Sequence, residues 1–302
     1  MNFTGQYTLE ETVERGCVAT IGFFDGVHCG HRFLLRQVVG KAAELGLPSV
    51  VVSFSNHPAS VLRPELRPLL LTSSAEKVGL LRSAGADCVA LIDFTPDISH
   101  MSARDFMQEF LLKTLNVKVL LMGYDHHFGS DRLKGFHEYE KIAHKIGLHI
   151  ERAHECLVDG VPVSSSRIRK LMAAAQIDQV NRLLGYTYSV SGVVEHGNAI
   201  GTTLGFPTAN IRLNSAKQLP ASGVYSVVAL VNGVEYRALA NIGTNPTVGN
   251  DHLSLEVHLL DFQGDLYDQS LVIAFHRFLR HEQKFASLSD LQHQIQRDIE
   301  SL

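Results

Sequence analysis

The chain has 302 residues, of which 45% are hydrophobic and 19% charged, and it contains 24 glycines and 9 prolines. This length fits two domains, and the composition excludes both a disordered chain, which has too few apolar residues, and a fibre, which has periodic glycine or proline. The formal net charge of -4 argues against a protein that neutralises the phosphates of a long nucleic acid, so we expect no nucleic-acid partner.

Signals for export, a membrane span or a metal cage are absent from the sequence. The first residues are acidic and lack an apolar segment after basic ones, and no stretch approaches the roughly 18 apolar residues of a spanning helix. The four cysteines form no CxxC pair, and the 16 histidines form no HExxH motif. We therefore predict a cytoplasmic protein with reduced thiols, no membrane partner and no structural zinc.

The first half alternates short apolar segments with longer segments of helical period. The predicted strands are residues 17–22, 49–54, 88–92 and 117–122, and the predicted helices are residues 32–45, 75–83 and 103–115. This alternation predicts a mostly parallel sheet with right-handed crossovers, which is a Rossmann-like α/β domain. Ligands of such sheets bind beyond the carboxyl ends of the strands.

The second half is predicted to be a small closed β-barrel. Its expected strands are residues 188–194, 222–231, 234–241, 253–260 and 271–278. The pair Asn232-Gly233 indicates a type I′ hairpin between the second and third of them.

One amphipathic helix, residues 288–299, is expected to end the chain. Ser287 or Ser289 is its predicted N-cap, and its apolar face consists of Leu288, Leu291, Ile295 and Ile299. Two short helical segments, residues 167–175 and 177–184, precede the barrel. We place the domain boundary near residues 184–187, which gives domains of residues 1–186 and 187–302.

The segment GFFDGVHCGH, residues 22–31, passes from a predicted strand through a glycine-rich turn into a helix. A helix N-terminus offers free N–H groups and a positive dipole end, and His28 and His31 add donors toward a phosphate. Gly26 and Gly30 let the backbone approach closely. This suits nucleotidyl transfer, which needs positioning and stabilised charge but no protein nucleophile. Two ordinary surface or core histidines are the alternative.

Two further segments of the first domain carry groups suited to phosphates. SSSRIR, residues 164–169, offers hydroxyls, a helix cap and two guanidinium groups, and it would complete a clamp on the β- and γ-phosphates of ATP. A solvated helix cap explains it equally well. GYDHHFG, residues 123–129, follows the last predicted strand, so Asp125 is expected at the same edge of the sheet. There it is either a contact to ATP or magnesium or a carboxylate that stabilises a turn.

In the barrel half, Thr208 and Asn210 are two apart on an extended segment and point to one side. Their neutral oxygens suit a magnesium ion already bound to nucleotide phosphates, although a simple turn is an alternative. Glu256 interrupts a predicted strand and is either a solvated carboxylate or a base that faces a pocket. The apolar face of that strand is expected to consist of Leu253, Leu255, Val257 and Leu259.

Several motifs in order resemble the prokaryotic bifunctional riboflavin kinase/FAD synthetase family. GFFDGVHCGH, SFSNHP (residues 53–58), GYDHHFG and SSSRIR resemble its adenylyltransferase module, which has a nucleotidyltransferase-like fold. FPTAN (residues 206–210), ASGVYSV (221–227), NIGTNPT (241–247), LEVHLLDF (255–262) and the segment from residue 279 to residue 298 resemble its riboflavin kinase module. The resemblance implies that the C-terminal domain phosphorylates riboflavin to FMN. The N-terminal domain would adenylylate FMN to FAD and release pyrophosphate, with ATP and Mg²⁺ required.

The resemblance also implies roles for individual residues. In the first domain it assigns ATP binding to His28, Gly30, His31, Asp125, Ser165, Ser166 and Arg169, and the border of the flavin to Phe54, His57 and Pro58. In the second it makes Glu256 the base for the ribityl 5′-hydroxyl and Thr208 and Asn210 the magnesium and phosphate pair. Gly205 and Pro207 belong to the same loop, and Arg280, Glu282 and Phe285 shape the flavin site.

Three departures from the family pattern are visible. Ser166 replaces the usual threonine and keeps the hydroxyl, and His126 replaces the usual phenylalanine. The loop Gly201-Thr202-Thr203-Leu204-Gly205 lacks the arginine that many members carry, which predicts weaker ATP binding. Two other functions remain open from the sequence: an adenylyltransferase whose barrel only binds a flavin, and a non-enzymatic flavin carrier.

Overall fold

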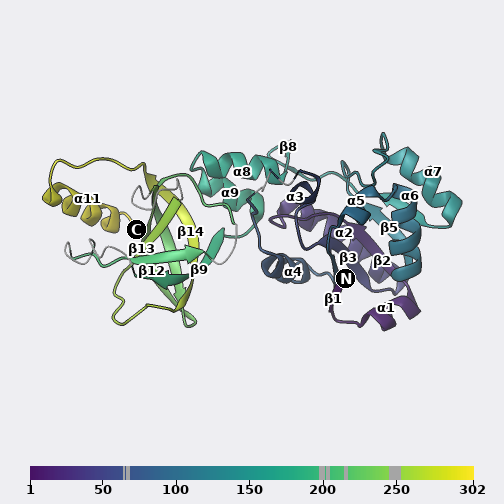
Figure 1. Cartoon of the computed structure of the whole chain (residues 1–302), viewed down its shortest axis with the longest axis horizontal. Coiled ribbons are helices and arrows are strands. Elements are labelled where there is room, and N and C mark those ends of the chain that lie inside the picture. Colours follow the sequence, from purple (N-terminus) through teal and green to yellow (C-terminus); the bar gives the residue numbers. More distant parts are fainter. Residues whose placement is uncertain (64, 66–68, 197–200, 202–204, 214–216, 245–252) are drawn as a thin grey trace. The chain divides into compact units, whose positions relative to one another are not determined.

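The computed structural model describes residues 1–63, 65, 69–196, 201, 205–213, 217–244 and 253–302 (Figure 1). The chain forms two compact units, Met1–Ser164 and Ser165–Leu302. The first has the predicted α/β architecture, and the second contains the predicted barrel with its terminal helix.

A six-stranded sheet with the order β1-β4-β3-β2-β5-β6 forms the centre of the first unit. The four predicted strands are present and pair in parallel as β2 (Cys17–Ile21), β3 (Ser49–Phe54), β4 (Cys88–Ile92) and β5 (Val117–Met122). The sequence pattern does not predict the edge strands β1 (Asn2–Gly5), antiparallel to β4, and β6 (His149–Arg152), parallel to β5. Each has four residues, too few for a distinct alternating pattern.

Apolar residues fill both faces of this sheet. Along β2, Ala19 and Ile21 belong to one hydrophobic cluster and Val18 belongs to another, as expected where helices cover both faces. The predicted helix at residues 103–115 is α6 (Ala103–Phe106) followed by a π-helix, η1 (Met107–Thr114). The other elements are α1 (Leu9–Arg15), α2 (Cys29–Leu45), α3 (Pro58–Leu62), α4 (Ser74–Ser83), α5 (Pro96–His100), α7 (Phe136–Ile146) and the short hairpin β7 (Leu157–Val158) and β8 (Val161–Pro162).

The strand order sets the place of the predicted phosphate motif. The chain proceeds from β2 to β3 and β4 on one side of the sheet, and then crosses to β5 and β6 on the other. The segments that follow β2 and β5 therefore diverge at the carboxyl edge, where ligands of open α/β sheets bind. His28 follows β2 and Asp125 follows β5, so both lie at this edge.

The barrel of the second unit closes in the order β10-β13-β12-β11-β14-β9. The five predicted strands correspond to β9 (Ser189–Glu195), β11 (Gly223–Val231), β12 (Val234–Thr244), β13 (Leu253–Leu259) and β14 (Ser270–Arg280). The sixth, β10 (Ala209–Leu213), contains the end of the FPTAN segment. Asn232 and Gly233 have φ values of 49° and 84°, which confirms the type I′ hairpin.

Two helices that precede the barrel, α8 (Ser165–Ala173) and α9 (Ile177–Leu184), belong to the same compact unit. The Asn181 amide donates to the Phe275 carbonyl at 2.8 Å and accepts from the Tyr188 N–H at 2.8 Å. These contacts fix α9 on β14, which explains why the compact division falls at residue 164 and not at residues 184–187.

The terminal helix α11 (Leu288–Glu300) begins as predicted, with Ser287 as its N-cap. The first residue of each of two predicted apolar faces is exposed. Leu288 is 64% exposed because it is the first residue of its helix, and Leu253 is 42% exposed because it is the first residue of its strand. The remaining predicted members of the β13 face, Leu255, Val257 and Leu259, are buried.

Candidate functional site

His28 and His31 lie together at the start of α2. His28 is the N-cap, and its Nδ1 accepts a hydrogen bond from the His31 backbone N–H at 3.4 Å. The two rings stack with their centroids 3.6 Å apart, and a Cβ at Gly30 would lie 3.2 Å from the His28 ring. Because Nδ1 of His28 is an acceptor, the proton of the neutral ring is on Nε2. The helix start thus combines an Nε2–H donor with free backbone N–H groups, as a phosphate site requires.

Burial keeps this group of imidazoles uncharged at neutral pH. It lowers the pKa of His28 to about 4, with the Asp125 carboxylate opposing part of the shift. It lowers the pKa of His31 well below its usual value, and the nearby His28, His126 and Lys77 lower it further. Burial also lowers the pKa of His126 to about 4. The structure therefore brings the segments after β2 and β5 into one neutral, histidine-rich neighbourhood.

The turn between β2 and α2 is held in place by Asp25, which the sequence motif does not single out. The Asp25 carboxylate accepts from the Leu71 and Thr72 backbone N–H groups at 3.0 and 3.1 Å. The Thr72 hydroxyl oxygen in turn accepts from the Gly26 N–H at 3.1 Å. Gly26 has a φ of 79°, a conformation that strains any residue with a Cβ. Gly26 is therefore required by the shape of the turn.

Phe54, His57 and Pro58, the predicted border of the flavin, lie at the carboxyl edge of the sheet. Phe54 ends β3, His57 is the N-cap of α3, and Pro58 is its first residue. The His57 ring packs edge-on against the Phe23 ring with their centroids 4.6 Å apart. The structure brings these residues to the edge that carries His28, and their role toward a flavin stays a prediction.

Ser165, Ser166 and Arg169 lie in the first turns of α8. The Arg169 backbone carbonyl accepts from the Gln218 side chain at 3.2 Å, within the second compact unit. Their joint action with His28 on ATP stays a prediction.

Glu256 lies on β13 between two asparagines. The register of β13 with β10 places Asn210 opposite Glu256, and the register with β12 places Asn241 opposite it on the other side. Opposed residues share one face of a sheet. The Thr208 hydroxyl also donates to Glu256 Oε2 at 3.4 Å. The structure therefore brings Glu256, Thr208 and Asn210 together, and it places Asn241 beside Glu256 as a neighbour that the motif alone does not indicate.

The FPTAN segment is fixed by His258, two residues beyond Glu256. Its Nδ1–H donates to the Pro207 carbonyl at 2.8 Å. Gly205 has a φ of 82°, which favours glycine at the end of the loop. Residues 202–204, where the expected arginine is missing, lie outside the described residues.

A cavity of about 370 Å³ opens beside Glu256, with lining from the barrel strands and from α11. The predicted flavin residues Arg280, Glu282 and Phe285 all line it, together with Thr208. Its apolar lining comprises Phe285 together with Phe206, Val224, Leu239, Ala240, Leu291 and Ile295. A cavity lined by both apolar and polar side chains suits a flat ring system that carries a polar chain.

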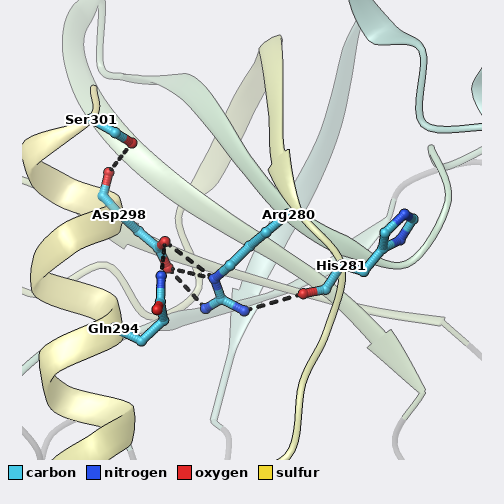
Figure 2. A network of polar contacts seen from close by, with 5 residues as sticks. All are labelled: Arg280, His281, Gln294, Asp298 and Ser301. Atoms are coloured by element: carbon cyan, nitrogen blue, oxygen red, sulfur yellow. Dashed lines mark hydrogen bonds and ion pairs between the residues drawn. The ribbon is translucent and has the colours of Figure 1, made fainter.

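Arg280 at the end of β14 is held by Asp298 of α11 (Figure 2). Its Nε and Nη2 donate to the Asp298 carboxylate at 3.0 and 2.8 Å, and its Nη1 donates to the His281 carbonyl at 3.2 Å. Gln294 donates to the same carboxylate at 2.8 Å. This bidentate pair fastens α11 to the barrel along the wall of the cavity.

We expect Asp298→Asn to lower the free energy of unfolding by about 1.5 to 3 kcal/mol, the usual worth of hydrogen bonds to a charged group. The asparagine removes the charge and one of the two acceptors while the guanidinium stays enclosed. Denaturant unfolding checks this, with Glu300→Gln on the exposed side of the same helix as the control, which should change stability by less than about 0.5 kcal/mol. An unfolding free energy equal to that of the wild type contradicts the role given to the pair.

Comparisons with known proteins match both halves of the chain. The family model of FAD synthetase matches residues 10–167, and that of riboflavin kinase matches residues 184–302. A bifunctional riboflavin kinase/FMN adenylyltransferase from Pseudomonas fluorescens is 42% identical over 94% of this chain and 91% of its own length. A protein of the same description from Escherichia coli strain K12 is 37% identical over 97% of this chain and 94% of its own.

A solved structure from Streptococcus pneumoniae, described as a macrolide-efflux protein, is also similar. It has a TM-score of 0.86 and 30% identity, and the match covers 94% of this chain and 93% of that one. That description concerns the other protein. In the part of this chain that the structure describes, no helix has both the length and the apolar character to cross a membrane. On the family matches and the full-length relatives, this chain belongs to the family of bifunctional riboflavin kinase/FMN adenylyltransferases.

Proposed function

We propose that this chain phosphorylates riboflavin to FMN in its barrel and adenylylates FMN to FAD in its α/β domain, with ATP as the donor in both steps. Family membership over both halves supports the pair of activities. One observation carries the kinase step: Glu256 lies between Asn210 and Asn241 and lines a cavity of about 370 Å³. In this proposal the partners are small molecules only, without nucleic acid or membrane, and the enzyme is cytoplasmic.

In the kinase step, Glu256 accepts the proton of the ribityl 5′-hydroxyl as that oxygen attacks the γ-phosphorus of ATP. The new bond joins the 5′-oxygen to phosphorus, and the bond from the γ-phosphorus to the β,γ-bridging oxygen breaks, so that ADP leaves. A positioned base must lie within hydrogen-bond reach of its proton. The Thr208 hydroxyl donates to Glu256 Oε2 at 3.4 Å, and both residues line the cavity.

The residues beside Glu256 also fit the magnesium ion that this family implies. Thr208 and Asn210 supply neutral oxygens next to a carboxylate, and oxygen donors are what Mg²⁺ prefers. Few protein donors are needed, because Mg²⁺ usually keeps several waters and the phosphates of its nucleotide. When bound, the ion would neutralise phosphate charge. We propose Thr208 and Asn210 as the residues that hold it.

In the adenylyl step, a phosphate oxygen of FMN attacks the α-phosphorus of ATP, and the bond to the pyrophosphate oxygen breaks. The negative charge that develops on the phosphates requires hydrogen-bond donors in fixed positions. His28, with its proton on Nε2, and the N-terminus of α2 supply such donors without a change of protonation. Ser165, Ser166 and Arg169 are proposed to bind the outer phosphates, and Asp125, which follows β5, is proposed as a further ATP contact.

We propose that the two activities divide at the predicted boundary, into residues 1–186 and 187–302. The limits of the two family matches, residues 167 and 184, support a boundary in this region. We expect residues 1–186 to make FAD from supplied FMN and no FMN from riboflavin. Residues 1–164 lack Arg169 and its serines and should make no FAD. Chromatography of the flavins measures the products of both N-terminal fragments. FMN formed from riboflavin by residues 1–186 or by residues 1–164 contradicts the division.

Incubation of the full chain with riboflavin and MgATP, followed by chromatography over time, tests the proposed function. We expect FMN to appear first and FAD to follow, with one equivalent of ADP and then one of pyrophosphate. An adenylyltransferase with a barrel that only binds flavin would leave riboflavin unchanged and still convert supplied FMN. A flavin carrier would bind flavin and consume no ATP.

A further inference from the structure

Lys77 on α4 is a buried lysine at the carboxyl edge of the sheet. It is 2% exposed, and its Nζ donates to the Phe23 carbonyl at 3.1 Å and to the Phe54 carbonyl at 2.5 Å. The same nitrogen lies 4.1 Å from the centroid of the Phe23 ring. Among the residues that the structure describes, its hydrogen-bond acceptors are these two carbonyls and no carboxylate, and a buried ammonium held in this way costs free energy.

The start of α4, just before Lys77, is held by contacts to the segments after β2 and β3. Ser73 and Glu76 form a capping box, and the Ser74 hydroxyl donates to the Ser55 carbonyl at 2.8 Å, directly after β3. The Asp25 carboxylate, in the turn after β2, accepts a hydrogen bond from the Thr72 backbone N–H. Lys77 therefore contacts the segments at the ends of β2 and β3 from a helix whose start is held in place.

The two strand ends that Lys77 joins carry the candidate site. Phe23 contacts His57 with ring centroids 4.6 Å apart, and the next residue, Phe24, contacts His31 with centroids 5.1 Å apart. Phe54 is itself a predicted flavin neighbour. A shift of the Lys77 ammonium would consequently move both the phosphate side and the flavin side of the site.

The titratable groups near Lys77 include the Asp25 carboxylate and the imidazoles of His31 and His57. Asp25, in the turn after β2, favours its charged form, and His57 shares the Phe23 ring with it. His31, from α2, has a strongly lowered pKa to which Lys77 itself contributes. Burial lowers the pKa of Lys77 from 10.5 to about 8, so the ammonium is charged at neutral pH and loses its proton in mild alkali.

We propose that Lys77 is a positioning residue for adenylyl transfer: its charged ammonium joins the ends of β2 and β3 and thereby fixes His31 and His57 against the two substrates. This inference rests on the adenylyltransferase function proposed above. A neutral amine donates weaker hydrogen bonds to the two carbonyls and places no positive charge near the phosphates. Charge and geometry are therefore lost together when the proton leaves.

Lys77→Met tests the inference in the full-length protein, because methionine keeps most of the length and removes the charge. We expect kcat for FAD formation from supplied FMN to fall by about 10- to 100-fold, with KM for ATP changed less than about threefold. Small misplacement of catalytic groups acts mainly on the transition state. Riboflavin phosphorylation in the same sample should be unchanged. Lys113→Met, which removes an exposed lysine paired with Glu109, is the matched control and should leave both rates unchanged.

The wild-type pH profile is a second test that needs no variant. We expect FAD formation from FMN to decrease as the pH rises through about 8, while riboflavin phosphorylation in the same samples lacks this decrease. In Lys77→Met the alkaline decrease should disappear. If that variant does not fold, the wild-type profile alone decides.

Two results would overturn the inference: Lys77→Met with unchanged kcat, even if less stable to heat, or a wild-type profile with no alkaline decrease specific to FAD formation. Both differ from a failure of the proposed function, in which the wild-type protein makes no FAD from FMN at any pH.

Discussion

We expect Glu256→Gln to lower FMN formation from riboflavin by about 10²- to 10⁴-fold, the contribution of a positioned general base. Glutamine keeps the shape of the side chain and can still accept the hydrogen bond from Thr208, but it cannot take the proton of the 5′-hydroxyl. FAD formation from supplied FMN should stay at the wild-type rate. Flavin chromatography from one sample measures both reactions, so the second serves as an internal check on protein quality.

Glu235→Gln is the matched control for this variant. Glu235 is also a strand carboxylate of the barrel, but it is exposed at the β11–β12 hairpin, away from the cavity. We expect it to leave both rates unchanged and to change stability by less than about 0.5 kcal/mol. If Glu256→Gln behaves like this control, Glu256 is a solvated carboxylate and the base lies elsewhere.

The parallel strands were predictable because they are buried on both faces. β3, with the sequence SVVVSF, has no exposed residue, and its three consecutive valines with Phe54 form a short β-rich apolar segment that the sequence shows directly. β10 escaped prediction because Asn210 and the preceding proline are typical of turns, and only closure of the barrel makes this segment a strand. The π-helix of η1 depends on local hydrogen bonds that the helical period of its apolar residues does not specify.

Some residues of the candidate site can be predicted from local sequence patterns, and others are found only from the tertiary structure. Thr208 and Asn210 were predictable from a two-residue spacing, and His28 from its place between strand and helix. Asn241 joins Glu256 only through the register of β12 with β13, which local pattern does not fix. Lys77 stands in a helical segment where lysine normally indicates a solvent face, so only tertiary packing shows that it is buried.

We expect His31→Ala to lower FAD formation from supplied FMN by about 10²- to 10³-fold, the usual effect of removing one donor that acts on developing charge. Riboflavin phosphorylation should continue, so FMN accumulates when riboflavin is supplied. His137→Ala, an exposed histidine at the start of α7, is the control. Unchanged FAD formation would remove His31 from the phosphate site.

His28 needs a different variant, because it is also the N-cap of α2, and loss of a cap by itself costs about 1 kcal/mol of stability. His28→Asn keeps a cap acceptor and removes the Nε2–H donor, so we expect wild-type stability with a 10²- to 10³-fold loss of FAD formation. Since burial lowers the pKa of His28 to about 4, its ring is neutral throughout the range from pH 5 to 8, and the wild-type rate should not change with the protonation of this ring there. A rate that decreases as the pH rises through about 6.5, and that no longer does so in His28→Asn, would mean that the ring acts in its charged form with its ordinary pKa.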